Sequence, residues 1–592
     1  MKKIIDIITE PIAKAFEVCG YDTKYAKVTV SNRPDLCEYQ CNGAMAAAKE
    51  YKKAPIMIAT DIVNALAEEK ILKDLVAVNP GFINFNLDET FVKEYLSKMA
   101  MDEKAGYESC GEKKTVVVDY GGANVAKPLH VGHLRSAVIG EAVKRMNRFA
   151  GYEVIGDVHL GDWGLQMGLI IEELHERKPE LVYYDESYSG EYPKDAPFTI
   201  SELEEIYPCA NAKSKKDPEF KERAHLATLK LQQGYKPYRA LWKHILDVSV
   251  TDLKKNYGNL NVEFDLWKGE SDADPYIPKL IDLLNEKGLL HESEGAMVVD
   301  VVEETDTKEI PPCIIQKSDG AALYATSDLA TLIQREEDFH PDLVVYLADK
   351  RQEMHFTQVF RVAKKAGIMG ENTKLVFNGF GTMNGKDGTP FKTRDGGVMR
   401  LEYLISEINE AVYNKIMENR SVSEEEARLT AKTVGMSALK YGDLSNQASK
   451  DYIFDIDKFT SFEGNTGPYI LYTIVRIKSI LNKYMEGKNL TVQDIDFTKI
   501  NEASSASEKA LMLELARFND MLENAISELA PHKICNYIYS LANDFNKFYH
   551  DTKILAEEDD TKQKGYIALI GLTRKVLEIC IDLLGFEAPD RM

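Results

Sequence analysis

The stretch from Thr115 to Gly164 constrains the fold of this chain more strongly than any other part of the sequence. Thr115 to Val118 is a short β-branched run typical of a buried parallel strand, and Gly121 and Gly122 end it. Val154 to Leu160 begins another strand. Between the two, apolar residues recur with helical spacing at Leu134, Val138, Ala142, Met146 and Phe149. A helix between two such strands predicts a βαβ unit, as in nucleotide-binding sheets.

The first turn of this helix carries residues that suggest chemistry. His130 and His133 lie three positions apart and share one helical face, while Gly132 lets another group approach the backbone. A helix N-terminus favours anions because its N–H groups lack partners. Two histidine donors there would suit a triphosphate as charge builds up on its α-phosphate. The alternative is a pair of ordinary helix histidines, which the strand–loop–helix context disfavours.

The same segment resembles a known family. Residues 123–133 are similar to the HIGH signature of class I aminoacyl-tRNA synthetases, and the Asn-x-Ala-Lys-Pro lead-in resembles the bacterial-type arginyl-tRNA synthetases in particular. The resemblance implies an ATP site in a Rossmann fold, with catalytic roles for Lys127, His130 and His133. The ATP-binding residues that it implies are Ala123, Asn124, Val125, Ala126, Lys127, Pro128, Leu129, His130, Val131, Gly132 and His133.

A second stretch, Gly379 to Gly397, combines six glycines with three cations in nineteen residues. Flexible cations beside a nucleotide can neutralise pyrophosphate and close over it, whereas a solvated hairpin is the alternative. The position matches the KMSKS loop of class I synthetases, but the first lysine of that motif is missing. The resemblance therefore implies catalytic roles for Lys386, Lys392 and Arg394, with Lys386 in place of the missing lysine.

An arginine pocket should contain acids, because a guanidinium is bound best by carboxylates in bidentate geometry. Asp119 and Asn124 flank the loop after the first strand, at the strand end where α/β sheets bind ligands. Tyr324 and Asp328 would share a helical face. The resemblance assigns these four and Gln352 to arginine, with the tyrosine and the second acid facing the guanidinium and the other pair serving the α-amino end. Either acid taken alone is also explained as a cap or turn residue.

The first 110 residues predict a small α+β domain without a catalytic constellation. Its expected elements are helices over Ile4–Cys19, Gln40–Tyr51 and Pro55–Glu68, and strands over Lys27–Ser31 and within Leu75–Leu87. Residues 41–49 and 81–85 resemble the N-terminal extension of arginyl-tRNA synthetases, which in the family touches the tRNA elbow. A folded appendage without a ligand is the alternative.

A long, charged and mostly helical insertion interrupts the nucleotide fold at about residues 172–300. The resemblance implies that it faces the acceptor end of tRNA. Its basic run Lys213–Lys216 is expected to be a solvated loop. Further strands are expected over Gly295–Val302, Cys313–Gln316, Leu343–Ala348 and Lys374–Phe377.

Residues 461–592 follow a helical connector at 401–460 and consist of long amphipathic segments. One helix seam is expected to run through Ile534, Ile538, Leu541, Phe545 and Phe548. The segment resembles the anticodon-binding helical domain of arginyl-tRNA synthetases. Some of its aromatic residues are expected to stack on unpaired bases, and the implied tRNA contacts are Tyr469, Tyr549 and Met592.

Composition limits the remaining possibilities. A chain of 592 residues implies roughly three to five domains. Its eight cysteines are scattered without zinc-ligand spacing, which argues against structural zinc and fits a reducing cytosol. The N-terminus is not expected to act as a signal peptide, and no apolar run is long enough to span a membrane. A net charge of −22 argues against a general nucleic-acid binder but permits a shape-led tRNA contact.

The sequence thus predicts a multidomain α/β protein. Its expected parts are a small N-terminal α+β domain (1–110), a Rossmann catalytic domain (111–400) with the insertion, the connector, and an all-α anticodon-binding bundle (461–592). The resemblance implies a monomeric cytoplasmic ligase that converts L-arginine and ATP, with Mg²⁺, to arginyl-adenylate and transfers arginine to the 3′ end of tRNA(Arg). No metal-binding residue, DNA partner or membrane partner is expected.

Three alternatives stay open from the sequence. A cysteine or glutamine enzyme of the same class is opposed by the N-terminal domain and by the missing cysteine–histidine zinc cluster. A non-catalytic tRNA-binding protein is favoured only by the altered loop and opposed by the intact His130, Gly132 and His133. A small nucleotidyltransferase leaves most of the chain unexplained.

Overall fold

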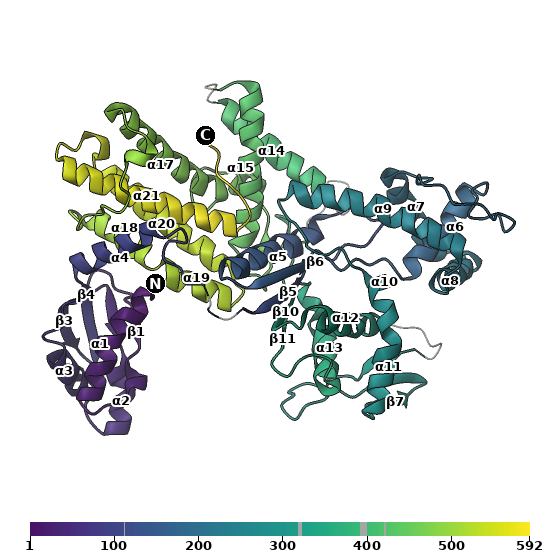
Figure 1. Ribbon diagram of the computed structural model, residues 1–592, viewed down its shortest axis with the longest axis horizontal. Helices are drawn as coiled ribbons and strands as arrows, with labels where there is room; N and C mark the ends of the chain where they lie inside the picture. The colour runs from purple at the N-terminus through teal and green to yellow at the C-terminus, as the bar shows by residue number, and fades with distance from the viewer. Residues whose placement is uncertain (110, 112, 318–322, 391–398, 419–421) are drawn as a thin grey trace. The chain divides into compact units, whose positions relative to one another are not determined.

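The computed structural model describes residues 1–109, 111, 113–317, 323–390, 399–418 and 422–592, and it divides into two compact units (Figure 1). The larger unit comprises residues 110–461 and 583–586, and the other unit comprises residues 1–109, 462–582 and 587–592. Among the described residues, no helix has the length and apolar content to cross a lipid bilayer. The predicted four-part domain division stays a prediction.

A four-stranded parallel sheet lies at the centre of the larger unit, with strand order β11-β10-β5-β6. Its strands are β5 (Thr115–Asp119), β6 (Glu153–Asp157), β10 (Leu343–Tyr346) and β11 (Lys374–Phe377). Helix α5 (Val131–Phe149) joins β5 to β6, which confirms the predicted βαβ unit. Strand β6 ends before Leu160, where its prediction ended, because the backbone of Val158 and Leu160 bonds to Leu266 and Lys268 instead of to the sheet.

Two helices, α12 (Tyr324–Phe339) and α13 (Glu353–Ala366), pack on this sheet (Figure 1). Their apolar faces and the sheet form one buried cluster, which includes Val117, Leu329, Leu332, Val344, Val359 and Val362. Burial of aliphatic side chains on this scale is the main stabilising contribution of such a core. It fixes the strand ends and the start of α12 relative to one another.

The insertion contains α6 (Leu165–Arg177), α7 (Ile200–Ser214), α8 (Pro218–Gln232), α9 (Lys236–Asn259), α10 (Glu270–Ala273) and α11 (Ile277–Glu286). Helices α6 to α9 extend away from the sheet, whereas α10 and α11 lie beside α12, and Leu280 and Leu284 of α11 belong to the buried cluster (Figure 1). An antiparallel sheet follows, with strands β7 (Leu290–Ser293), β8 (Ala296–Val299) and β9 (Cys313–Gln316). The prediction of a loop at Lys213 was wrong: Lys213 lies in α7, where it pairs with Glu176 and covers the ring of Phe220.

The chain after the parallel sheet forms β12 (Met383–Asn384), α14 (Leu401–Glu418), α15 (Glu424–Leu444), β13 (Tyr452–Ile453) and α16 (Ile456–Phe459). Strand β12 pairs in parallel with β13. The buried guanidinium of Arg135 on α5 holds this region, because it donates to Asp443 on α15 and to the carbonyl oxygens of Gly381 and Lys450.

The other unit begins with an antiparallel sheet of order β1-β2-β4-β3. Its elements are α1 (Ile4–Val18), β1 (Val28–Val30), β2 (Tyr39–Cys41), α2 (Gly43–Tyr51), α3 (Pro55–Ala65), β3 (Leu72–Val78), β4 (Phe82–Leu87) and α4 (Glu89–Met101). The predicted helix over Gln40–Tyr51 was wrong at its start. Tyr39–Cys41 is a strand because it pairs with both β1 and β4, a long-range effect that local helix propensity does not report.

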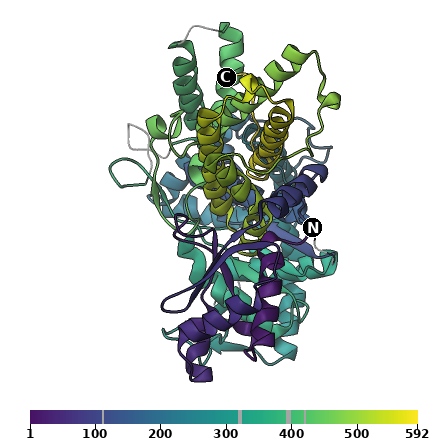
Figure 2. The same ribbon diagram turned by 90° about the vertical axis from the view of Figure 1, so that its left-hand side faces the viewer.

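The rest of this unit is a helical bundle, visible in Figure 2. It contains α17 (Gly467–Lys488), α18 (Ala506–Ala516), α19 (Phe518–Ser527), α20 (Pro531–Asp551) and α21 (Asp560–Leu583). The predicted seam on α20 is confirmed, since Ile534, Ile538, Leu541, Phe545 and Phe548 are all fully buried.

Candidate active site

The loop between β5 and α5 is fixed by backbone hydrogen bonds to the segment after β6. The amide of Val125 donates to Gly161, and the amide of Gly161 donates to Ala123, both at 3.1 Å. Gly161 cannot be replaced without displacement, because a Cβ there would lie 1.9 Å from Oδ1 of Asn124. Ala126 takes a left-handed conformation (φ 58°), and its amide donates to Ser249 Oγ on α9. Asn124 is thereby held at the mouth of the βαβ unit.

The two histidines cap the N-terminus of α5. Nδ1 of His130 accepts from the amide of Gly132 at 3.0 Å, and Nδ1 of His133 accepts from the amide of His130 at 3.3 Å. Their ring centroids lie 4.0 Å apart. An imidazole that accepts at Nδ1 carries its proton on Nε2 when it is neutral. Both rings therefore offer an Nε2–H donor to a ligand.

Burial keeps these rings neutral. It lowers the pKa of His130, and the charge of Lys127 lowers it further. Burial, followed by His130 and Lys127, lowers the pKa of His133 to about 3. At neutral pH the positive charge of this segment thus belongs to Lys127, whose ammonium lies 4.6 Å from the ring centroid of Tyr207.

The residues that follow the glycine-rich stretch are tied to the start of α5. Val131 donates to the carbonyl of Met399, and Leu401 donates to that of Leu129. Lys392 and Arg394 lie outside the described residues. Lys386 is described: its Nζ lies 3.2 Å from Oδ1 of Asp455, just before α16, and 65% of its side chain is exposed.

A row of polar groups crosses the carboxyl ends of three strands, because the register pairs Asp119 with Asp157 on one side and with Tyr346 on the other. Arg335 from α12 joins the row, and its Nη2 lies 2.6 Å from Asp119 Oδ2 and 2.8 Å from Asp157 Oδ2. Burial raises the pKa of Asp119, while the guanidinium of Arg335 opposes this increase. The pair of acids therefore holds a cation that belongs to the protein.

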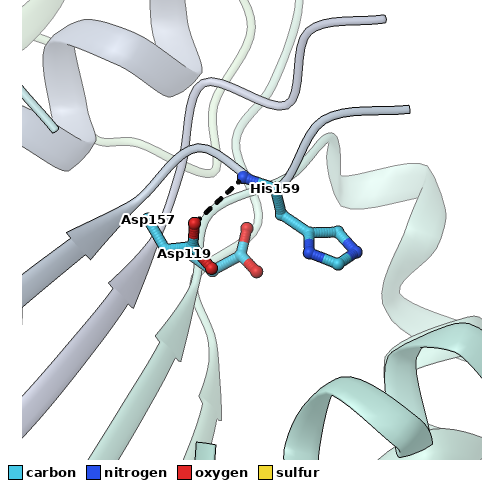
Figure 3. A group of neighbouring side chains, drawn as sticks. All are labelled: Asp119, Asp157 and His159. Carbon is cyan, nitrogen blue, oxygen red and sulfur yellow. Dashed lines mark hydrogen bonds between the residues drawn. The ribbon is translucent and has the colours of Figure 1, made fainter. Parts of the chain in front are cut away.

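His159 follows β6 and lies beside the two acids (Figure 3). Its amide donates to Asp157 Oδ1, and its backbone is left-handed (φ 42°). Ligand atoms of Asp119, Asp157 and His159 lie within 4.8 Å of one another, which is close enough to share a cation. Because the guanidinium of Arg335 already contacts both carboxylates, the donor set does not fit a resident metal ion.

A second acidic position lies at the start of α12. Tyr324 and Asp328 are one helical turn apart, as predicted, and Asp328 Oδ2 lies 2.5 Å from Nε2 of His355 on α13. Glu270 on α10 faces them: burial raises its pKa to about 7, with a smaller contribution from Asp328. Partial desolvation and Glu270 also raise the pKa of Tyr324, although 74% of this residue is exposed. Gln352 ends the short 3₁₀ helix Lys350–Gln352, and its side chain is exposed.

Sequence reasoning missed two of these residues. Glu270 belongs to a four-residue helix inside the insertion and carries no motif. Arg335 had a weak signal, because it follows Asp328 by seven residues and therefore lies two turns further along the same helical face.

The predicted tRNA contacts lie in the other unit. Tyr469 is engaged in packing, since its hydroxyl donates to Asn543 and accepts from Asn546. Tyr549 is 40% exposed, and the guanidinium of Arg476 covers its ring as well as that of Tyr472. Met592 is the last residue and is half-buried.

A model of the catalytic domain of class I tRNA synthetases for arginine (R) matches residues 95–456. The chain belongs to the arginyl-tRNA synthetase family. Two further models support this membership: an arginyl-tRNA synthetase N-terminal domain over residues 2–87 and a DALR anticodon-binding domain over residues 470–592. The predicted family and fold class are confirmed.

Curated relatives match this chain over its whole length. An arginine–tRNA ligase of Agathobacter rectalis is 64% identical, and one of Alkaliphilus oremlandii is 56% identical, each over 100% of both chains. The crystal structure of arginyl-tRNA synthetase from Plasmodium falciparum has a TM-score of 0.84 at 26% identity and covers 100% of both chains. The sequence matches and the structural match thus all extend over the full length of the chain.

Proposed function

We propose that the ends of β5, β6 and β10, with the first turns of α5 and α12, form the active site of an arginine–tRNA ligase. The family activity is the ATP-dependent joining of arginine to tRNA(Arg) for protein synthesis. The observation that supports this location is the presence of two separate acidic positions, Asp119 and Asp328. Both contribute to the raised pKa of Tyr346, which follows mainly from burial, so both lie close to that ring.

Arginine carries a cation at each end, and the two acidic positions match them. Asp328 and Glu270 bind the guanidinium, with the hydroxyl of Tyr324 beside them. Asp119 and Asn124 bind the α-ammonium group, and Gln352 contributes at this end. The guanidinium is planar and presents several N–H donors, which an ammonium group cannot do, so two acids and a phenol favour arginine over lysine.

ATP binds at the start of α5 through residues 123–133. The Nε2–H groups of His130 and His133 donate to the phosphates, and Lys127 supplies positive charge. The arginine carboxylate attacks the α-phosphorus and pyrophosphate leaves, which forms arginyl-adenylate. A terminal ribose hydroxyl of tRNA then attacks the arginyl carbonyl and AMP leaves. The protein acts by positioning and charge stabilisation, without a covalent intermediate of its own.

Mg²⁺ would arrive with the ATP phosphates, since its hard oxygen ligands are then mainly phosphate and water. Lys386, Lys392 and Arg394 would neutralise the leaving pyrophosphate. Tyr469, Tyr549 and Met592 would contact the anticodon region, and the N-terminal domain the tRNA elbow. We further propose that the enzyme acts as a cytoplasmic monomer without a DNA partner.

The test is ATP–pyrophosphate exchange with each amino acid, with and without cognate tRNA. We expect exchange with arginine alone, and we expect it to depend on tRNA, because the loop lacks its first lysine and needs tRNA to favour the closed state. Exchange with another amino acid would contradict the pocket assignment. Robust exchange without tRNA would contradict the coupling but not the pocket.

A further inference from the structure

The side chain of Arg335 places a guanidinium of the protein among the acids of the proposed arginine pocket. Only 3% of its side chain is exposed, and one nitrogen, Nη2, contacts both Asp119 and Asp157. Its guanidinium carbon also lies 5.3 Å from the ring centroid of Tyr346. Among the described residues, none donates to Oδ1 of Asp119, and 15% of that side chain is exposed. One oxygen of Asp119 is thus available to a ligand while the other is occupied.

The second acidic position has no described arginine of the protein in contact with its carboxylates. Asp328 lies on the same helix face as Arg335, about 10 Å away along the axis. In the part of the chain that the structure describes, no arginine or lysine lies within ion-pair distance of Asp328 or Glu270. The strand-end acids therefore have a permanently charged partner, whereas Asp328 has only the imidazole of His355, and Glu270 has no ion-pair partner among the described residues.

This difference matters because free arginine is cationic at both ends. Two adjacent carboxylates on neighbouring strands are a better partner for a guanidinium fork than for an ammonium point charge. Without Arg335, Asp119 and Asp157 would attract the substrate guanidinium and turn the molecule end for end. Its carboxylate would then lie away from the histidines of α5.

We propose that Arg335 is a positioning residue that sets the orientation of bound arginine, because its own guanidinium occupies the Asp119–Asp157 pair and leaves only Asp328 and Glu270 for that of the substrate. The inference rests on the proposed function. A permanently charged group suits this role, since its protonation does not change with pH, and its Nη2 alone contacts both carboxylates.

Ethylguanidine tests the proposal, because it carries a guanidinium but no ammonium group. Its inhibition constant is measured against arginine in tRNA-dependent pyrophosphate exchange with the full-length protein. Asp328→Ala should weaken inhibition about tenfold or more, through loss of a charge-assisted hydrogen bond. Adding Arg335→Gln to Asp328→Ala should restore inhibition about tenfold, at the vacated acid pair. A third change, Asp157→Asn, should abolish the restored inhibition.

Arg335→Gln alone should lower kcat and KM for arginine together, the signature of non-productive binding, whereas a merely structural role would lower kcat or raise KM. Arg135→Gln is the matched control, since Arg135 is equally buried beside Asp443 but outside the pocket. In the Asp328→Ala background it should leave ethylguanidine inhibition unchanged. If Arg335→Gln does not fold, Arg335→Met decides by the same criterion, because its uncharged side chain likewise leaves both carboxylates without the cation that now contacts them.

Two failures are distinguishable. If ethylguanidine binds no better after Arg335→Gln than in Asp328→Ala alone, the orientation role is wrong while the pocket stands. If Asp328→Ala changes neither ethylguanidine inhibition nor the KM for arginine, the proposed pocket itself is wrong.

Discussion

The nucleotide end and the arginine end of the proposed site are built in opposite ways. At the nucleotide end, His130 and His133 lie on one helix turn and are oriented by the helix's own amides. At the arginine end, Asp119, Glu270, Asp328 and Arg335 come from β5, α10 and α12, which are far apart in sequence. The first arrangement is local and neutral, whereas the second is long-range and charged.

This contrast indicates which changes should impair binding at each end of the proposed site. A local cap tolerates changes elsewhere in the chain but fails when one of its members is lost. A charged cluster of distant residues depends on burial and on the balance of its partners, so its affinity for a cation changes with pH and with single charges. The predictions below test whether the two ends respond in these different ways.

The largest effect is expected at the nucleotide end. His130→Ala or His133→Ala should reduce the rate of adenylate formation about 10²–10³-fold, because each removes a donor to developing phosphate charge. The KM for arginine should change little. Pyrophosphate exchange under saturating arginine measures this, with thermal unfolding as the folding control. Normal activity in both variants would show that the HIGH assignment is wrong.

At the arginine end, Asp328→Ala and Glu270→Gln should each raise the KM for arginine about 10- to 100-fold, because each removes a charge-assisted contact to the guanidinium. The KM for ATP should stay near its normal value. Arginine and ATP titrations of the exchange rate separate the two substrates. Equal increases in both KM values would indicate a general folding defect and would remove the distinction between the two ends.

The two ends should also differ in pH dependence. The pKa of Glu270 is raised to about 7, and only its carboxylate form pairs with a guanidinium. As pH falls below 7, the KM for arginine should therefore rise, approaching about tenfold per pH unit. Glu270→Gln should remove this dependence.

The KM for ATP serves as the internal control for this pH effect. The pKa values of both histidines are lowered, that of His133 to about 3, so neither ring titrates at the ordinary histidine value of about 6.5. Binding of ATP should therefore show no histidine transition near that pH. A transition near pH 6.5 in the KM for ATP would contradict the neutral cap.

The smallest effect concerns Lys386. Its ion pair with Asp455 is exposed, and surface pairs of this kind add little stability, so Lys386→Ala should leave the melting temperature unchanged. We expect tRNA-dependent exchange to fall by about two- to fivefold. Asp455→Asn, which removes the nearer of the two acidic partners of this lysine, should not lower it. Unchanged exchange in Lys386→Ala would show that this lysine does not replace the missing one.

Much of the catalytic frame follows from the sequence by itself. The β-branched run at Thr115, the helical spacing from Leu134 and the adjacent histidines are local patterns with local physical causes, so they predict the βαβ unit and its cap. Asp119 and Asn124 are predicted site residues because strand ends bind ligands in such sheets. The motif for Tyr324 and Asp328 depended on one helical turn, and this geometry is also local.

Only the tertiary structure decided how these parts combine. Parallel register aligned Asp119 with Asp157 and Tyr346, and no local pattern announces that register. Tertiary packing also brought Glu270, on a four-residue helix, to face Asp328. Pairing with a strand on each side made Tyr39–Cys41 a strand. Burial in the folded protein raised the pKa of Glu270 to about 7. The packing of α12 against the sheet brought Arg335 into contact with two carboxylates. Residue types and local periods are written in the sequence, whereas desolvation and charge pairing depend on which distant groups the packed core brings together.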